Sequence, residues 1–218
     1  MSCALCATRK PRRFCPAVAG EICTVCCASS REQSLDCPLS CEHLLQAHQH
    51  ERVTQTPAGD GMPKSDMTLS EQMLRDNEWF FAALLPAIAN VARRHPAVND
   101  WDARDALDSL VRTWRTLQSG LYYESKPVNL RAGDIYQAAR ACIADIQETA
   151  EKAGERGALP DAVVLAVLVF LHRLERIHNN GKPRSRAFLA FLCEFTPARE
   201  DPDLSDVSVQ PPAPLLIL

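Results

Sequence analysis

The sequence has no apolar run long enough to cross a membrane. Its longest run, residues 162–171, contains ten residues, whereas a spanning helix needs about 20. The first residues also lack the basic and then apolar pattern of a secretory signal. We therefore expect a cytoplasmic protein without a membrane span, in which reduced cysteines bind metal more readily than they form disulfides.

The net charge is also small, and aromatic residues are few. The 218 residues carry a formal net charge of −3, and aromatic residues make up 6% of the chain. A chain that mainly neutralises nucleic-acid phosphate would be far more basic. The nucleotide-binding, hydrolase and zinc-protease patterns GxxxxGKS/T, GxGxxG, GxSxG and HExxH are absent. The sequence therefore predicts a protein that is not an enzyme.

Cysteine, in contrast, is abundant and unevenly placed. Eight of the ten cysteines fall within the first 41 residues, mostly in closely spaced groups. Tetrahedral zinc binds thiolates held a few residues apart, and two such ions need as many thiolates as this segment supplies. The segment predicts two bound zinc ions, with these ligands: Cys3, Cys6, Cys15, Cys23, Cys26, Cys27, Cys37 and Cys41.

The shortness of the segment suggests how the eight cysteines divide between the two zinc ions. A segment too short to fold by burial alone favours a cross-braced arrangement, in which alternate groups share an ion. Cys3 and Cys6 would share one ion with two thiolates of the 23–27 cluster. The other ion would be bound by the third cluster thiolate and the remaining cysteines, Cys15, Cys37 and Cys41.

Several points about these ligands stay open. Adjacent Cys26 and Cys27 point in different directions and are expected to bind different ions, without an assignment of each to one ion. His43, His48 or His50 can replace a thiolate, but the thiolate count is complete, and we expect His48 and His50 to face solvent. An iron–sulfur cluster or disulfides use the same residue type, although paired thiolates suit structural zinc better.

The most basic part of this segment contains Arg9, Arg12 and Arg13. Arginines beside zinc thiolates donate hydrogen bonds to sulfur and so lower the cost of concentrated negative charge. The same side chains can instead contact phosphate. We favour hydrogen bonding to sulfur, because the segment is negatively charged once its eight thiolates are counted.

Four regions follow one another along the chain. They are a cysteine-rich module (1–52), a linker rich in Pro, Gly and small polar residues (53–65), a helical domain (66–196) and a proline-rich tail (197–218). The tail is predicted to be disordered. Its last four residues are Leu-Leu-Ile-Leu. This apolar end either folds back on the helices or serves as a docking peptide, and the sequence leaves both alternatives open.

Apolar residues recur at helical spacing in the third region. The pattern predicts helices over 69–91, 99–118, 131–152, 161–178 and 185–195. A short helix is also predicted over 44–52, at the end of the cysteine-rich module. Pro86 is expected to kink or split the first long helix. The predicted fold class is a small metal-stabilised zinc module followed by an all-α irregular helical bundle, with 161–178 at its centre.

A loop in the helical region combines aromatic and charged residues. One interpretation is a recognition surface, which would contain Arg115, Tyr122, Tyr123 and Glu124. The other is that the tyrosines pack over the end of the bundle and donate to backbone carbonyls. Glu175 and His178 match one half of the ferritin-like di-metal motif, and the other half is absent from the sequence. We therefore expect these two residues to lie on a polar helix face. A solvated edge is expected for Asp102 and the acidic residues that follow it.

Three stretches resemble a group of uncharacterised bacterial proteins with an N-terminal cysteine-rich module and a helical remainder. They are Arg13-Phe14-Cys15-Pro16-Ala17 with Ile22-Cys23-x-x-Cys26-Cys27, Arg115-Thr116-Leu117-x-Ser119-Gly120-Leu121-Tyr122-Tyr123-Glu124, and Pro183-Arg184-Ser185-Arg186-Ala187-Phe188-Leu189. The resemblance extends over nearly all of residues 1–196. It implies a bacterial, cytoplasmic, zinc-binding protein, and it implies no particular activity. The spacing is also similar to HIT and MYND fingers, which mediate protein contacts, except that Val18 stands where those fingers have a cysteine.

These features favour a non-enzymatic adaptor. Its zinc module would present a surface to a protein partner, while the helical domain binds another partner or self-associates. Two alternatives stay open. One is a nucleic-acid or ribosome-associated zinc-finger factor that uses residues 9–13, and the other is a thiol-based redox or metal sensor in which Cys26 and Cys27 release zinc on oxidation.

Overall fold

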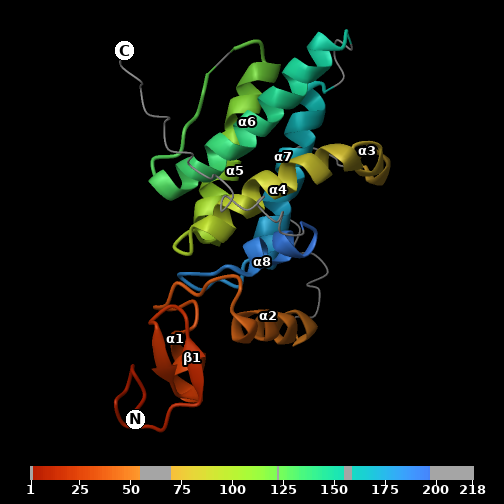
Figure 1. Cartoon of the computed structure of the whole chain (residues 1–218). Coiled ribbons are helices and arrows are strands. Elements are labelled where there is room, and N and C mark those ends of the chain that lie inside the picture. The colour runs from red at the N-terminus through yellow and green to blue at the C-terminus, as the bar shows by residue number, and fades with distance from the viewer. Residues whose placement is uncertain (1, 55–69, 122, 155–158, 197–218) are drawn as a thin grey trace, which may run out of the picture.

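The computed structural model describes residues 2–54, 70–121, 123–154 and 159–196. The predicted tail and most of the predicted linker lie outside these residues. The described residues form one β-hairpin and eight helices. In Figure 1 they make a small N-terminal module and a larger helical body, so the mostly helical fold class is confirmed.

The module contains β1 (Arg13–Cys15), β2 (Gly20–Ile22), α1 (Thr24–Ser30) and α2 (Glu42–Thr54). The body contains α3 (Glu71–Asp76), α4 (Glu78–Arg94), α5 (Asp100–Gln118), α6 (Leu130–Lys152), α7 (Asp161–His178) and α8 (Ala187–Glu194). The helix predicted over 44–52 corresponds to α2, and the last four predicted helices correspond to α5, α6, α7 and α8.

The hairpin places the N-terminal loop beside the start of α1. The antiparallel register is Arg13↔Ile22, Phe14↔Glu21 and Cys15↔Gly20. Ala4 N donates to Glu21 O at 2.9 Å, so the loop lies against β2. Gly20 permits this approach, because a Cβ there would stand 3.3 Å from the Ala4 Cβ. Residues 3–6 therefore lie close to residues 23–26.

The core of the body forms where α5 packs against α7, with α4, α6 and α8 around this pair. The helices meet through apolar residues at helical spacing, as an amphipathic helix requires. The largest include Phe80, Leu84, Ile88, Leu107, Leu110, Ile135, Leu168 and Phe188. Residues 164–169 of α7 are all buried, which agrees with the predicted central place of this helix.

The helix predicted over 69–91 is interrupted at Asn77. Of the kink or split predicted at Pro86, the split is wrong, because α4 continues through this residue. Asn77 ends α3 and begins α4, and its Nδ2 donates to Met73 O at 2.7 Å. Pro86 lies inside α4 and removes the N–H that would bond to Ala82 O. Ala82 is exposed, so water can satisfy this carbonyl and the helix continues.

A buried carboxylate connects the start of α5 to the start of α8. Asp100 Oδ2 accepts hydrogen bonds from Ser185 Oγ at 2.6 Å and from Phe188 N at 3.0 Å. Asp100 Oδ1 accepts another from Leu189 N at 3.1 Å. Burial raises the pKa of Asp100 to about 6, although these hydrogen bonds act in the opposite direction.

We expect Asp100→Asn to lower the free energy of unfolding by about 1–3 kcal/mol near neutral pH, because the amide would turn an N–H group toward donors. The difference from wild type should widen as the pH falls from about 7 to about 5. The folded pKa of Asp100 exceeds its unfolded value, so proton uptake stabilises the native wild-type protein and cannot occur in the variant. Urea unfolding at both pH values measures this, and a narrowing difference would contradict the prediction.

Asp102 is buried, so the solvated edge predicted for this residue is wrong. It is the third residue of α5 and completes a capping box, in which Asn99 N donates to Asp102 Oδ2 at 3.0 Å. Arg131 Nε donates to the same oxygen at 3.0 Å, and Asn129 Nδ2 donates to Asp102 Oδ1 at 2.5 Å. The Asn-x-x-Asp spacing at a helix start is the sequence signal that indicates this role.

Candidate metal centre

Four of the N-terminal cysteines form one group. The N-terminal loop and α1 bring the sulfur atoms of Cys3, Cys6, Cys23 and Cys26 within 4.8 Å of one another. A tetrahedron with Zn–S bonds of about 2.3 Å has edges of about 3.8 Å, so a small contraction fits a four-coordinate divalent ion. This group can therefore hold a metal ion, and no second group of His, Cys, Asp or Glu within the described residues is as close.

Backbone N–H groups point at these sulfur atoms. Cys23 N donates to Cys3 Sγ at 3.2 Å, and Cys26 N donates to Cys23 Sγ at 3.4 Å. The second bond makes Cys23 the N-cap of α1, so the CxxC turn and the first helical turn coincide. N–H donors favour the thiolate over the thiol, and the thiolate is the form that binds metal.

The thiols of this group do not ionise independently. The Thr8 hydroxyl and the backbone N–H groups of Arg9 and Thr8 lower the pKa of Cys6 to about 5. The neighbouring Cys23 sulfur and burial raise the pKa of Cys26 to about 12. Close thiolates repel one another, and coordination of a divalent cation removes this repulsion. The donor set therefore suits a cation.

Of the three arginines favoured for hydrogen bonding to sulfur, Arg9 and Arg13 lie beside cysteine sulfurs. The neighbouring cysteine sulfurs raise the pKa of Arg9, and Arg13 Nη1 donates to Cys27 Sγ at 3.8 Å. Arg12 is exposed. Arg31, which sequence reasoning missed, also donates to Cys27 Sγ at 3.8 Å. Its position one helical turn after Cys27 is the signal that would have identified it.

The other four N-terminal cysteines line one small cavity. Cys15 comes from β1, Cys27 from α1, and Cys37 and Cys41 from the segment before α2, with His43 beside them. The cavity holds about 10 Å³, roughly the space of one water-sized sphere. Burial, together with the charges of Cys41 and Cys15, raises the pKa of Cys37 to about 11. These sulfurs lie farther apart than those of the first group.

The adjacent cysteines of α1 thus point to different places, as expected from the sequence. Cys26 belongs to the first group, and Cys27 lines the second cavity. The predicted exposure of the nearby histidines holds for His50. It is wrong for His48, which is 2% exposed and whose Nε2 lies 2.9 Å from Glu32 Oε1.

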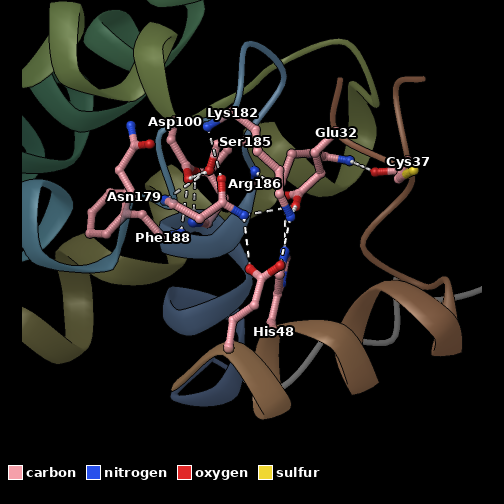
Figure 2. Close-up of polar contacts among 12 residues, drawn as sticks. Glu32, Cys37, His48, Asp100, Asn179, Lys182, Ser185, Arg186 and Phe188 are labelled. Carbon is pink, nitrogen blue, oxygen red and sulfur yellow. Dashed lines mark hydrogen bonds and ion pairs between the residues drawn. The ribbon is translucent and has the colours of Figure 1, made fainter. Parts of the chain in front are cut away.

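Glu32 connects the module to the helical body (Figure 2). Its fully buried carboxylate lies 2.9 Å from His48 Nε2 and accepts from Arg186 N at 2.7 Å. It also accepts from Asn180 Nδ2 at 2.8 Å and Lys182 Nζ at 3.3 Å. Burial alone would raise its pKa, but these partners, His48 above all, lower it to about 2.

Arg186 extends this connection. Its side chain is 1% exposed, and it donates from Nη1 to Cys37 O at 3.0 Å and from Nη2 to Ala92 O at 2.5 Å. Glu32 O accepts from Arg184 N at 2.8 Å. The segment 32–37 is therefore held to the body at both of its ends. Nothing in the spacing of these residues along the chain indicates this contact.

The residues predicted to form a recognition surface have different environments. Tyr122 lies outside the described residues. Tyr123 is 68% exposed, and Arg115 is exposed as well. Glu124 instead accepts from Tyr136 Oη at 3.1 Å, which fixes the loop to α6. The exposed part of this surface is therefore smaller than the sequence indicates.

The polar face predicted around Glu175 is wrong for this residue. Glu175 is fully buried and pairs with Arg104 Nε at 2.6 Å. The ring of His178 stacks on Phe191 with 3.8 Å between centroids. Both residues of the half di-metal motif are therefore used in packing and pairing.

An apolar groove of about 610 Å³ lies on the body among α3, α4, α7 and α8. Its walls include Leu74, Phe81, Leu85, Phe170, Leu174 and Phe195, and charged residues Glu71, Arg75 and Glu78 also line it. Helix α3 contributes no buried residue and extends from the body in Figure 1. One wall of the groove therefore carries side chains that no other part of the described chain fully covers.

Comparison of the chain with protein-family models, curated proteins and solved structures finds no significant match. Among the helices that the structure describes, none is long and apolar enough to span a membrane.

Proposed function

We propose that this protein is a non-enzymatic adaptor with a zinc-stabilised N-terminal module. The observation that carries the proposal is the four-sulfur group of Cys3, Cys6, Cys23 and Cys26. Four thiolates in paired turns suit structural zinc, and they leave no open coordination position of the kind that a catalytic zinc ion needs. The expected role of the metal is thus structural: it stabilises the fold of the N-terminal module.

Two zinc ions per chain are part of this proposal. The first would be bound by the four-sulfur group. The cavity lined by Cys15, Cys27, Cys37 and Cys41 supports the second, because four thiols and two arginine donors gather around it. Its sulfurs would have to move closer together on binding.

The surface on which we expect a protein partner is the apolar groove of the body. We propose that it binds the apolar face of a partner helix, a recurring mode for grooves between helices. The uncovered wall formed by α3 supports this choice.

Affinity purification from native cells with the full chain tests the proposal. Leu74→Glu puts a charge in the groove on a helix without buried residues, so it should reduce capture of the partner at least about tenfold, which corresponds to about 1.4 kcal/mol. The matched variant Gln72→Glu, on an exposed position of the same helix, should capture as much as wild type. Equal capture by both variants would contradict a role of the groove.

The two alternatives predict other results. The nucleic-acid alternative has less support because Arg9 and Arg13 lie against sulfur. Capture that nuclease abolishes and that falls steeply with salt would favour it. Zinc release at low peroxide would favour the redox sensor, since a structural site keeps its metal under such treatment.

A further inference from the structure

We propose that the ion bound by Cys15, Cys27, Cys37 and Cys41 fastens the cysteine module to the helical body. The inference rests on the proposed function for the presence of zinc, and it gives the two ions different roles. It is carried by one juxtaposition: the sulfur-lined cavity lies directly beside the buried contact of segment 32–37 with the body.

The cavity lies between two parts of the module. Cys15 and Cys27 belong to β1 and α1, whereas Cys37 and Cys41 belong to the irregular segment that leads to α2. An ion at this place would join the hairpin and α1 to the segment that leads to α2, whose isolated bridge between Arg31 and Leu35 lies outside both strands of the hairpin. It would therefore fix where segment 32–37 begins and ends.

Cys37 belongs to both the cavity and the contact with the body. Its thiol lines the cavity, and its carbonyl accepts from Arg186 Nη1 at 3.0 Å. The backbone N–H of Glu32 also lies against this thiol. A metal ion that positions Cys37 would thus position the carbonyl for Arg186 and the backbone for Glu32.

Such positioning matters because the contact buries charged groups. Glu32 and Arg186 are almost completely buried, and Arg186 Nε has no hydrogen-bond partner among the described residues. Buried ions stabilise a structure only when their geometry satisfies them, and they destabilise it when a partner moves away. We therefore expect the contact to be sensitive to small shifts of Cys37.

In the part of the chain that the structure describes, the first site shows no such connection to the body. The hydrogen bonds to the sulfurs of its group come from within the module, from Cys23 N to Cys3 Sγ and from Cys26 N to Cys23 Sγ. This group lies where the N-terminal loop meets α1. The first ion would thus maintain the fold of the module, and the second would hold the module on the body.

The test combines zinc analysis with residue-resolved amide exchange on the full chain. Wild type should contain two zinc ions, and Cys41→Ser and Cys6→Ser should contain one each. His43→Gln is the matched control, because His43 borders the same cavity and should leave two ions bound. The informative amides are those of Arg184 and Arg186, which donate to Glu32.

In Cys41→Ser we expect the Arg184 and Arg186 amides to exchange at least about tenfold faster than in wild type. The Phe188 and Leu189 amides, which donate to Asp100 within the body, should keep their rates. Cys6→Ser should keep wild-type rates at all four positions. If Cys41→Ser does not fold, zinc titration of metal-free Cys6→Ser, which keeps only the second site, decides the question: protection at 184 and 186 must appear with its single equivalent.

The outcomes separate the two proposals. Wild-type protein without zinc would overturn the metal part of the proposed function. One zinc ion, lost in Cys6→Ser and kept in Cys41→Ser, would overturn only the second site. Zinc loss in His43→Gln with retention in Cys41→Ser would overturn the ligand set. Unchanged exchange at Arg184 and Arg186 in a Cys41→Ser protein with one ion would overturn the fastening role.

Discussion

Removal of bound metal by a strong chelator is expected to unfold residues 3–30 and to leave the helical body folded. The buried apolar cluster of the module consists of cysteines and one other residue, Ile22. Structural zinc contributes an apparent free energy of about 10–16 kcal/mol in small zinc modules. Without it, this stretch buries too little apolar surface to compensate the entropy of ordering its chain. The body has its own core.

Amide exchange reports the two parts separately. Cys3 N donates to Arg9 O and Arg12 N donates to Ile22 O within the module, each at 2.9 Å. These amides should lose most of their protection after chelation, while amides in the middle of α7 keep theirs. Added zinc should restore the protection, and added magnesium, which prefers oxygen ligands, should not. Module amides that stay protected in metal-free protein would contradict a zinc-dependent fold.

Glu32→Gln is expected to lower the free energy of unfolding by about 3–5 kcal/mol, the usual cost of breaking a buried ion pair. All four groups around the carboxylate are placed to donate: His48 Nε2, Arg186 N, Asn180 Nδ2 and Lys182 Nζ. A glutamine would turn N–H groups toward two of them and remove one of the two carboxylates that pair with Lys182. The two side chains have nearly the same shape, so packing should change little.

Urea unfolding of the zinc-loaded chain measures this effect. The control is Glu21→Gln, an exposed position of the hairpin, for which we expect a change within about 0.5 kcal/mol. A similarly small change for Glu32→Gln would show that the buried carboxylate does not hold the module on the body.

The helices could be predicted because their determinants are local. Apolar spacing identified α5, α6, α7 and α8, and their ends follow capping residues such as Asn99 and Asn129. The break in the first long helix was misplaced, because Pro86 is a strong local signal, whereas Asn77 is an ordinary helix residue until its cap geometry is known.

The two CxxC turns of the four-sulfur group could also be predicted, because their spacing is local, although the sequence left open which two thiolates of the 23–27 cluster lie beside Cys3 and Cys6. The contact around Glu32 could not. Its partners Asn180 and Arg186 are 148 and 154 residues away along the chain, and no periodicity connects positions so far apart. His48 was misjudged because helical spacing does not indicate its buried partner, Glu32. The groove likewise requires the packed arrangement of four helices.

The backbone at position 32 limits which amino acids can replace the glutamate. Its φ of 57° is left-handed, a conformation that glycine adopts freely and that asparagine and aspartate tolerate. Glycine would relax the backbone but supply no carboxylate, and aspartate would supply one on a side chain that is a methylene too short. Position 32 should therefore accept almost no exchange, although it belongs to neither group of cysteines.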